Sequence, residues 1–578
     1  MTYEPTGFAL QIFQSRHASH ETETWQEGCE RVALHVSNAE AGDARSVWKD
    51  RFTNVLKSNL LMPGGRIWYG SGRARGQLLN CFTAPAGDSR EAWGKTVSDS
   101  IVIAGTGGGV GINCSSVRPR GTPVRGTGGT ATGAVSLMEV INAAGEVIKA
   151  GGGRRTALML GLSIDHGDIV EFLDKKLDLK QLNNANVSVI FDDDPEIFFG
   201  LVRDGADFPL MHQGRQVGSI PSLELWQRIV KNALAGGEPG LLNGYLANKM
   251  SNIWYLEKLT ITNPCGEIWM PPYDCCCLAA IVLPRFVVDG AVQWELLKET
   301  VLTGVRFLDD VLTVNQYPLP EIAAKCAQLR RVGLGITGLH HMLLELGLKY
   351  KAPSGLEFVD ELMKKIKNWS YEASSDIAAE KGPFPGFDPE KFLKGTFVKG
   401  LKPSLREKIR TQGMRNCAVN TIAPTGTISI VCDTSSGIEP IFAAAHERRY
   451  RRGDEKMVEI VVDPMFQRFM DDGRDVEHFV GAHDLSIRDH LEMQRVCQRH
   501  VDNAVSKTIN LPSDTTIEEL SELYVEYFPD LKGVTVYPDG SREDQPLTAL
   551  PLGQAVLLAV GARSETTPID CASGSCDL

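Results

Sequence analysis

Three polar side chains of different chemistry occupy alternate positions of one short segment. Asn263, Cys265 and Glu267 supply an amide, a thiol and a carboxylate. If the segment is extended, alternate side chains point to one side, so that the three groups share one small volume. A carboxylate beside a thiol disfavours the thiolate. No histidine lies nearby in sequence to act as a base, although the fold could supply one. The segment therefore favours radical chemistry at the sulfur, which needs no low pKa, over attack by a thiolate.

The chain holds thirteen cysteines. Their number is odd, their spacing is irregular and no C-x-x-C occurs, so neither a disulfide scaffold nor a zinc ribbon is expected, and we expect no metal ligands. Most of them fit the role of buried free thiols that act as small apolar side chains. This explanation serves less well for the run Cys275-Cys276-Cys277 and for the pair Cys571 and Cys576 near the end.

Glycines cluster at residues 105–111 and again through 121–153, where arginines are interleaved with them. Neither a P-loop nor a strict G-x-G-x-x-G is present. Glycines let backbone amides approach an anion, and arginine suits phosphate oxygens, but tight turns with solvated charges would explain the pattern equally well. A third loop, at residues 424–429, offers hydroxyls and amides that could bind phosphate or form a capped turn.

The formal net charge is −12, which argues against a bulk electrostatic grip on nucleic acid. The first residues have no apolar core of the kind found in a secretory signal, and the longest apolar candidate, residues 555–562, is too short to cross a bilayer. We therefore expect a cytoplasmic protein with neither nucleic acid nor a membrane as a partner.

The elements that must position these residues alternate between strand-like and helix-like patterns, which predicts an α/β architecture. Residues 187–191, 279–283 and 427–431 are strand-like, and residues 136–150, 223–235 and 356–381 are helix-like. Residues 1–75 are expected to be helical. The last fifteen residues, 564–578, are typical of a flexible tail.

Several motifs, in order along the chain, together resemble the ribonucleotide reductase large subunit, and most closely its adenosylcobalamin-dependent class II. The resemblance covers roughly residues 60 to 545 and rests on the segments 63–66, 79–82, 107–113, 118–129, 147–149, 263–267, 271–273 and 420–429. It implies a ten-stranded α/β barrel with the Cys265 segment on an internal finger loop. The expected division is a helical N-terminal region (1–75), the barrel (76–450), a C-terminal part of the core (451–546) and a flexible tail with a redox dithiol (547–578).

The resemblance implies a role for each catalytic residue. Cys265 would carry the thiyl radical that removes the ribose 3′-hydrogen, Glu267 would take the 3′-hydroxyl proton, and Asn263 would bind the ribose hydroxyls. Cys81 and Cys276 would supply the reducing equivalents as the 2′-hydroxyl leaves. Cys276 is chosen from its run because the family spaces this cysteine eleven residues after the radical cysteine. Relatives usually have a different residue type at position 275.

The resemblance also implies nucleotide sites. The substrate would be bound by Asn80 and by the loop Pro424, Thr425, Gly426, Thr427, Ile428 and Ser429. A deoxynucleotide effector that selects the substrate would bind at Asp88, Arg118 and Arg125. The loop that relays this choice would contain Lys149, Arg154 and Arg155.

Each turnover would leave the catalytic cysteines as a disulfide in a closed pocket, so a mobile dithiol must carry electrons in. Cys571 and Cys576 fit this role, with thioredoxin or glutaredoxin as the external reductant. A homodimer and diphosphate substrates are the commoner choices in this class. The regulatory ATP cone of many relatives, about a hundred residues long, has no room before the barrel.

The radical source is inferred from what the sequence lacks. It has no C-terminal glycyl-radical motif, and the segment 533–540 has a single tyrosine, Tyr537, where the metal-dependent class has an adjacent pair. Adenosylcobalamin is therefore the expected cofactor. The main alternative is a class I-type large subunit that needs a separate metal-containing, radical-generating subunit. A non-catalytic nucleotide sensor is a further alternative, which would leave Cys265, Glu267 and the tail pair without a purpose.

Overall fold

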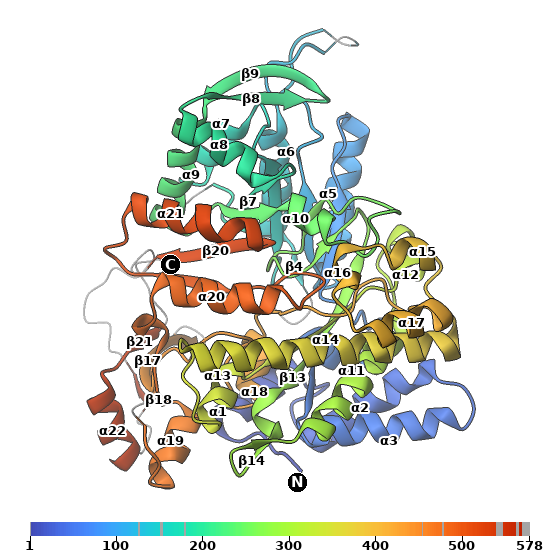
Figure 1. Ribbon diagram of the computed structural model, residues 1–578, viewed down its shortest axis with the longest axis vertical. Helices are drawn as coiled ribbons and strands as arrows, with labels where there is room; N and C mark the ends of the chain where they lie inside the picture. The colour runs from blue at the N-terminus through green and yellow to red at the C-terminus, as the bar shows by residue number, and fades with distance from the viewer. Residues whose placement is uncertain are drawn as a thin grey trace.

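A computed structural model describes residues 2–124, 126, 128–150, 154–177, 181–452, 455–476, 479–538, 547–561 and 566–568. Its centre is a ten-stranded sheet with outer helices around it (Figure 1). The strands of this sheet, in their spatial order, are β1 (Leu61–Pro63), β13 (Cys275–Val282), β2 (Cys81–Pro85), β3 (Gly109–Asn113), β6 (Leu158–Ser163), β7 (Ala185–Phe191), β10 (Gly240–Asn243), β20 (Gly533–Pro538) and β19 (Thr508–Leu511), with β16 (Val332–Thr337) paired to β13.

Apart from β1, which is antiparallel to β13, the sheet consists of two parallel halves. Strands β2, β3, β6, β7 and β10 are mutually parallel, as are β13 with β16 and β19 with β20. The halves meet in antiparallel pairs, β13 with β2 and β10 with β20. Bridges from Leu334 to Asn420 and from Ile422 to Val505 connect β16 to the chain before β19, which joins the two ends of the sheet. The predicted ten-stranded α/β barrel is therefore confirmed.

Most of the predicted elements are confirmed. The strand-like residues 187–191 and 279–283 lie in β7 and β13, every position of β13 is buried, and such continuous burial is typical of strands covered on both faces. The helix-like segments correspond to α6 (Ala134–Val147), α9 (Ser222–Gly236) and α14 (Pro353–Lys381). Other outer helices include α5 (Arg90–Gly105), α11 (Trp294–Val314), α17 (Pro403–Gln412), α20 (Ile487–Gln498) and α21 (Ile517–Tyr527).

The strand predicted at residues 427–431 is wrong, because this segment forms the short helix α18 (Gly426–Val431). Its β-branched residues favour a strand by propensity. The backbone of Thr425 is left-handed, however, with φ of 53°, and the Ser429 N–H donates to the Thr425 carbonyl at 2.8 Å. The tertiary turn at Thr425 therefore overrides the local preference.

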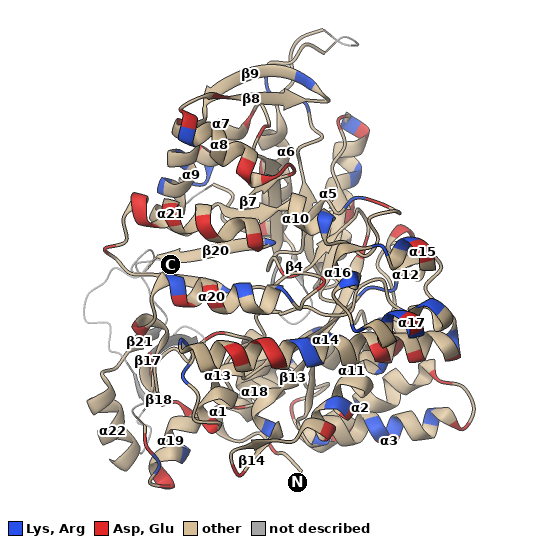
Figure 2. Ribbon diagram, in the orientation of Figure 1, with Lys and Arg blue, Asp and Glu red and all other residues tan. Residues whose placement is uncertain are grey.

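The N-terminal region contains α1 (Gly7–Arg16), α2 (Trp25–Val36), α3 (Ala44–Lys57) and α4 (Gly65–Gly70). Thr24 and Glu27 form a capping box at the start of α2. The region is not wholly helical, since β1 lies within it and pairs with β13 of the barrel. Lys and Arg are interspersed with Asp and Glu on the outer helices α3, α14 and α17 (Figure 2).

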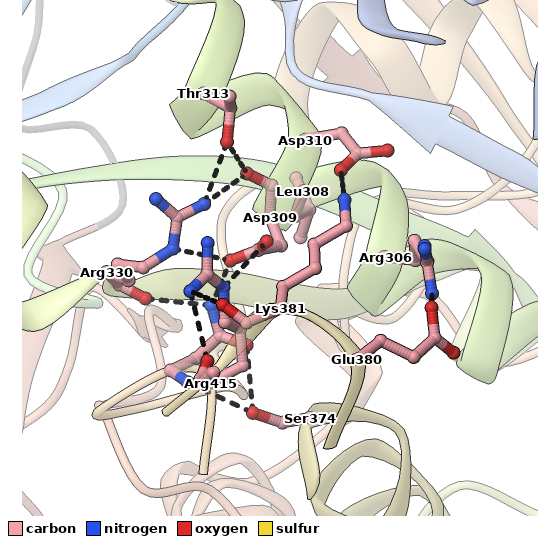
Figure 3. A network of polar contacts seen from close by, with 12 residues as sticks. Arg306, Leu308, Asp309, Asp310, Thr313, Arg330, Ser374, Glu380, Lys381 and Arg415 are labelled. Carbon is pink, nitrogen blue, oxygen red and sulfur yellow. Dashed lines mark hydrogen bonds and ion pairs between the residues drawn. The ribbon is translucent and has the colours of Figure 1, made fainter. Parts of the chain in front are cut away.

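A buried polar network attaches this region to the barrel helices. Arg306 of α11 donates to Glu40, which follows α2, at 2.7 Å and to Glu380 of α14 at 2.5 Å. Lys381 binds both Glu40 and Asp310, at 2.8 and 2.6 Å. Figure 3 shows the contacts of Lys381 with Asp310 and of Arg306 with Glu380. Burial raises the pKa of the Asp310 carboxyl to about 8.

A small four-stranded sheet lies beside the barrel, in the order β21 (Leu547–Ala549), β17 (Ala445–Arg452), β18 (Glu455–Val462) and β22 (Thr566–Pro568). The helices α19 (Pro464–Asp471) and α22 (Leu552–Gly561) pack on each other. The segment from residue 547, expected to begin a flexible tail, thus starts with a folded strand and helix, because Ala555 and Ala559 are buried against Phe466 and Phe469. In the part of the chain that is described, no helix combines the length and apolarity needed to cross a bilayer.

Candidate active site

Inside the barrel, a hairpin of β11 (Ile261–Thr262) and β12 (Trp269–Met270) carries the segment with Cys265 at its tip. The tip is a turn and not an extended strand, so the interpretation from alternating side chains is wrong in its geometry. The Gly266 N–H donates to the Asn263 carbonyl at 3.0 Å, and Gly266 has a φ of +81°, which glycine adopts without strain. The turn nevertheless directs Asn263, Cys265 and Glu267 into one cavity.

Glycines on the neighbouring strand make room for this finger loop. A Cβ atom on Gly111 of β3 would lie 1.9 Å from the Thr262 carbonyl oxygen, and one on Gly109 would lie 3.0 Å from the ring of Pro264. Part of the glycine cluster at residues 105–111 therefore serves close packing against the finger. Gly107, Gly108 and Gly109 also line the cavity.

Three hydrogen bonds from other strands and loops hold the finger in place. The Ala504 N–H and the Thr421 hydroxyl both donate to the Glu267 carbonyl at 2.8 Å. Asn186 of β7 donates from Nδ2 to the Pro264 carbonyl at 2.9 Å. This carbonyl belongs to the peptide bond that precedes Cys265, so Asn186 fixes the plane from which the thiol projects. Nothing in the sequence around Asn186 marks this role, because a bond across 78 residues leaves no local signal.

The cavity has a volume of about 380 Å³. The Cys265 sulfur borders it and is the exposed thiol among the eleven cysteines of the described part. Protein encloses the residue on its other sides, and this burial, followed by the nearby Glu267 carboxyl, raises the pKa of the Cys265 thiol. The thiol is therefore protonated at neutral pH, as expected for a hydrogen-atom donor and not for a thiolate nucleophile.

Glu267 is almost fully buried at the floor of the cavity. Burial raises the pKa of its carboxyl to about 7, although Asn263 and Cys81 stabilise the charged form. The Oε2 atom of Glu267 has no hydrogen-bond partner among the described residues. Asn263 donates from Nδ2 to Cys81 Sγ at 3.2 Å, and Cys81 Sγ lies 3.8 Å from Glu267 Oε1. A carboxylate with a free oxygen and a pKa near neutrality can accept a proton from a hydroxyl bound in the cavity.

Cys81 and Cys276 face each other across two strands. They are paired in the register of β2 and β13. Directly opposed residues of an antiparallel pair have Cα atoms about 4.5–5.5 Å apart, which lies within the roughly 4.4–6.8 Å that a disulfide spans. Cys275 and Cys277 point to the opposite face of β13, into the main core, where Cys277 Sγ contacts the Leu308 carbonyl at 3.3 Å. Of the three consecutive cysteines, Cys276 is thus the one opposite Cys81.

The loop at residues 424–429 forms the opposite wall. Pro424, Thr425, Gly426, Thr427 and Ile428 line the cavity together with Asn80. The backbone amides of the first turn of α18 lack partners within the helix, and such amides bind anions. Asn80 Oδ1 also has no partner in the described part of the chain. Ser429 was expected to bind the substrate, but its side chain is buried. Its hydroxyl donates to the Gly426 carbonyl at 2.9 Å and so stabilises the turn.

The predicted effector and specificity residues are described only in part. Arg118 Nε donates to Asp88 Oδ2 at 2.8 Å, so these two residues form an ion pair. Lys149 lies on β4 (Lys149–Ala150) and pairs with Arg155 of β5 (Arg154–Arg155). The next residues, Thr156 and Ala157, line the cavity, which places this hairpin directly before the cavity wall. Three predicted residues lie outside the described residues: Arg125, Cys571 and Cys576.

A second cavity, of about 300 Å³, lies at the finger tip and shares Pro264, Cys265 and Pro424 with the first. Its lining includes polar side chains from β7 and β20 and the ion pair of Lys176 with Glu238, 3.0 Å apart. Of the residues named from the sequence for the radical source, Tyr537 belongs to this lining; the cavity itself has no signal in the sequence. Among the described residues, no group of three or more His, Cys, Asp or Glu side chains could hold a metal ion.

Two family models match the chain. The model for the ribonucleotide reductase barrel domain matches residues 79–537, and that for the ribonucleotide reductase all-alpha domain matches residues 3–76. The chain belongs to the ribonucleotide reductase large-subunit family. The finger hairpin, the paired cysteines and the loop at residues 424–429 all lie within the barrel-domain match.

Curated relatives of this ribonucleotide reductase chain fall into two groups by name. A vitamin B12-dependent ribonucleoside-diphosphate reductase of Mycobacterium tuberculosis is 34% identical over 569 residues, covering 94% of this chain and 79% of the relative. A vitamin B12-dependent ribonucleoside-diphosphate reductase of Thermoplasma acidophilum is 35% identical, over 88% of this chain and 67% of the relative. A ribonucleoside-diphosphate reductase subunit alpha of Treponema pallidum is 26% identical, over 91% of this chain and 68% of the relative.

Proposed function

We propose that this chain reduces ribonucleoside diphosphates to 2′-deoxyribonucleotides by a thiyl radical at Cys265, with adenosylcobalamin as the radical source. The observation that carries the proposal is the convergence of the Cys265 thiol, the Glu267 carboxyl and the Cys81 thiol in one cavity, with Cys276 opposed to Cys81 on the neighbouring strand. Ribonucleotide reduction follows from the family. The radical chemistry, the role of each residue and the cofactor are the proposal.

Each side chain has a defined part in the reaction. The radical at Cys265 removes the 3′-hydrogen of the ribose, while the Glu267 carboxylate takes the 3′-hydroxyl proton and Asn263 binds the ribose hydroxyls. The 2′-hydroxyl leaves as water. Cys81 and Cys276 together give up two electrons and two protons and become a disulfide, and Cys265 returns its hydrogen to C3′. The products are one deoxynucleotide, one water molecule and one disulfide.

The substrate's phosphates would bind at the residues 424–429 loop, whose helix N-terminus suits an anion. Asn80, with a free amide oxygen, would bind the sugar or base. The diphosphate preference is supported by the names of the relatives from Mycobacterium tuberculosis and Thermoplasma acidophilum.

Adenosylcobalamin, when bound, supplies a carbon-centred radical by cleavage of its cobalt–carbon bond. At about 300 Å³ the second cavity could receive the adenosyl group and not the whole cofactor, and it borders Cys265 and is lined by polar side chains. Asn183, Glu238, Thr535 and Tyr537 would hold this group there. The names of the same two relatives support this assignment. The alternative is a class I-type large subunit that needs a separate metal-containing, radical-generating subunit; the relative from Treponema pallidum is named as a subunit alpha.

Two further parts of the proposal concern the reduction of the catalytic disulfide and the choice of substrate. Cys571 and Cys576 would carry electrons from thioredoxin or glutaredoxin to the oxidised pair. A deoxynucleotide effector would bind at Asp88, Arg118 and Arg125, and the loop with Lys149, Arg154 and Arg155 would relay its identity to the cavity. Residues 76–546 would act as one catalytic unit, since β19 and β20 complete the barrel, with the N-terminal region before it and the dithiol tail after it.

A homodimer is supported by an exposed apolar face on two helices that pack side by side, α5 and α6 (Figure 1). Ile101, Val102, Val140 and Val147 are exposed there. A second copy of the chain would cover this face, which adjoins the specificity hairpin. Val140→Glu should then give a monomer in light scattering.

The proposal is tested with purified protein, a dithiol reductant and ribonucleoside diphosphates, with deoxynucleotide formation as the readout. Product should appear when adenosylcobalamin is added and not in its absence. Product only after addition of a metal-containing radical subunit would overturn the cofactor assignment and leave ribonucleotide reduction intact.

A further inference from the structure

The two sulfurs of the Cys81–Cys276 pair lie in different surroundings. Cys81 lines the substrate cavity. Cys276 is fully buried and does not border that cavity, although both cysteines belong to one small apolar cluster with Ile268, Met270 and Leu278. A thiol that enters through the cavity can therefore reach the sulfur of Cys81 but not that of Cys276.

The charged neighbours of the two sulfurs also differ in sign. The Glu267 carboxyl lies 3.8 Å from Cys81 Sγ, which disfavours negative charge on that sulfur. On the other side of β13, Cys277 is in register with Val332 of the parallel strand β16. By the same register Cys276 is opposite Arg331, the residue that precedes β16. Opposed residues of a parallel pair point to the same face of the sheet.

Arg331 is buried and only partly paired. Its Nε donates to Asp274 Oδ2 at 2.6 Å and its Nη1 to Asn503 Oδ1 at 3.1 Å. Its Nη2 atom has no partner within the described chain. Burial raises the pKa of both thiols; the Arg331 guanidinium lowers that of Cys276, whereas Glu267 raises that of Cys81 further. Asp274 opposes a thiolate at Cys276, and the Arg331 guanidinium favours it.

We propose that the reducing thiol attacks Cys81, and that Cys276 leaves as a thiolate stabilised by Arg331. The inference rests on the proposed function. In the first step, an incoming thiolate forms a bond to Cys81 Sγ, the Cys81–Cys276 bond breaks, and its electron pair goes to Cys276. In the second step, the other sulfur of the dithiol, as a thiolate, attacks the first and releases Cys81. Both cysteines take protons, and the dithiol ends as a disulfide.

The geometry assigns Arg331 as a positioning residue for reactivation and gives it no part in substrate reduction. Leaving thiolates of lower pKa depart faster in thiol–disulfide exchange. Loss of the guanidinium should therefore slow disulfide reduction, whereas a single turnover by the pre-reduced protein does not require this step.

The attacked sulfur can be identified directly. The full-length protein is oxidised to the Cys81–Cys276 disulfide, mixed briefly with 2-mercaptoethanol, quenched in acid and alkylated, and its peptides are analysed by mass spectrometry. We expect the mercaptoethanol adduct on Cys81 and the alkyl group on Cys276. An adduct on Cys276, or equal adducts on both, would overturn the inference. Failure to form the disulfide at all would instead contradict the reductant pair of the proposed function.

The role of Arg331 is tested by comparing Asp274→Asn with the double variant Arg331→Gln, Asp274→Asn, which differ in the guanidinium alone. The disulfide of the double variant should be reduced by 2-mercaptoethanol more slowly than that of Asp274→Asn by on the order of tenfold, with an unchanged yield in a single turnover. The matched control compares Asp309→Asn with Arg330→Gln, Asp309→Asn in the neighbouring ion pair of 2.8 Å, and these two rates should not differ. Equal reduction rates in Asp274→Asn and its double variant would overturn the role of Arg331, and the site of the adduct in the unsubstituted protein tests the rest independently.

Discussion

Ionisation of the buried Glu267 carboxyl should raise the activity of the protein and lower its stability. Its pKa of about 7 in the folded protein compares with an ordinary value of 4.5. At 1.36 kcal/mol per pKa unit, ionising this group in the folded protein costs about 3 kcal/mol more than in the unfolded chain. Because the folded pKa is raised, the protonated form contributes stability that is fully present below pH 4.5 and is lost as the pH rises through about 7.

Glu267→Gln replaces the carboxyl by a neutral group of similar shape. The variant should have a larger free energy of unfolding than the natural chain at pH 8, by up to about 3 kcal/mol, and little or no gain near pH 4.5. Its turnover should fall by about 10²- to 10⁴-fold, because the general base is lost. Turnover of the natural chain should rise with pH through about 7, as the carboxylate form becomes populated.

The assay is denaturant unfolding of both proteins at pH 5 and pH 8, with deoxynucleotide formation measured in parallel. Glu522→Gln, on an exposed face of α21, is the control and should show no pH-dependent gain. The reasoning would be refuted if Glu267→Gln changed stability equally at both pH values, or destabilised the protein at pH 8.

Three further predictions follow from the same contacts. Asn186→Ala should lower kcat by about tenfold with KM nearly unchanged, because the Pro264 carbonyl loses its donor. The control is Asn232→Ala, which removes an equivalent 2.9 Å bond in α9 and should leave both parameters unchanged. Equal kinetics in the two variants would contradict the role of Asn186. Removal of the chain after Ser564 should spare activity with dithiothreitol and abolish it with thioredoxin, and equal loss with both reductants would contradict the shuttle. Asp310→Asn should raise stability more at pH 9 than at pH 5, since burial raises the pKa of this carboxyl to about 8, and unfolding by denaturant at the two pH values measures the difference.

The catalytic set could be predicted from the sequence because its members are marked by residue type and spacing. The motif around Cys265 and the eleven-residue spacing to Cys276 each lie within one short segment. The elements with strong periodicity, such as β7 and α14, were predicted for the same reason, since burial of one stripe or of a whole strand shapes the local pattern.

The parts that could not be predicted depend on contacts between distant segments. Asn186 and Arg331 have ordinary local surroundings, and their roles arise only when β7 meets the finger and β16 lies beside β13. The helix α18 was mistaken for a strand because the left-handed turn at Thr425 is held by tertiary hydrogen bonds. The finger tip was interpreted as extended because Gly266 permits a turn that a side-chain pattern does not reveal.

The most direct test of the central claim is a single turnover by pre-reduced protein with adenosylcobalamin and one ribonucleoside diphosphate, without external reductant. The natural chain should form one deoxynucleotide per active site together with a Cys81–Cys276 disulfide. Cys265→Ser should form neither, although it still binds the substrate. Deoxynucleotide formation by Cys265→Ser, or formation by the natural chain without oxidation of Cys81 and Cys276, would contradict this claim.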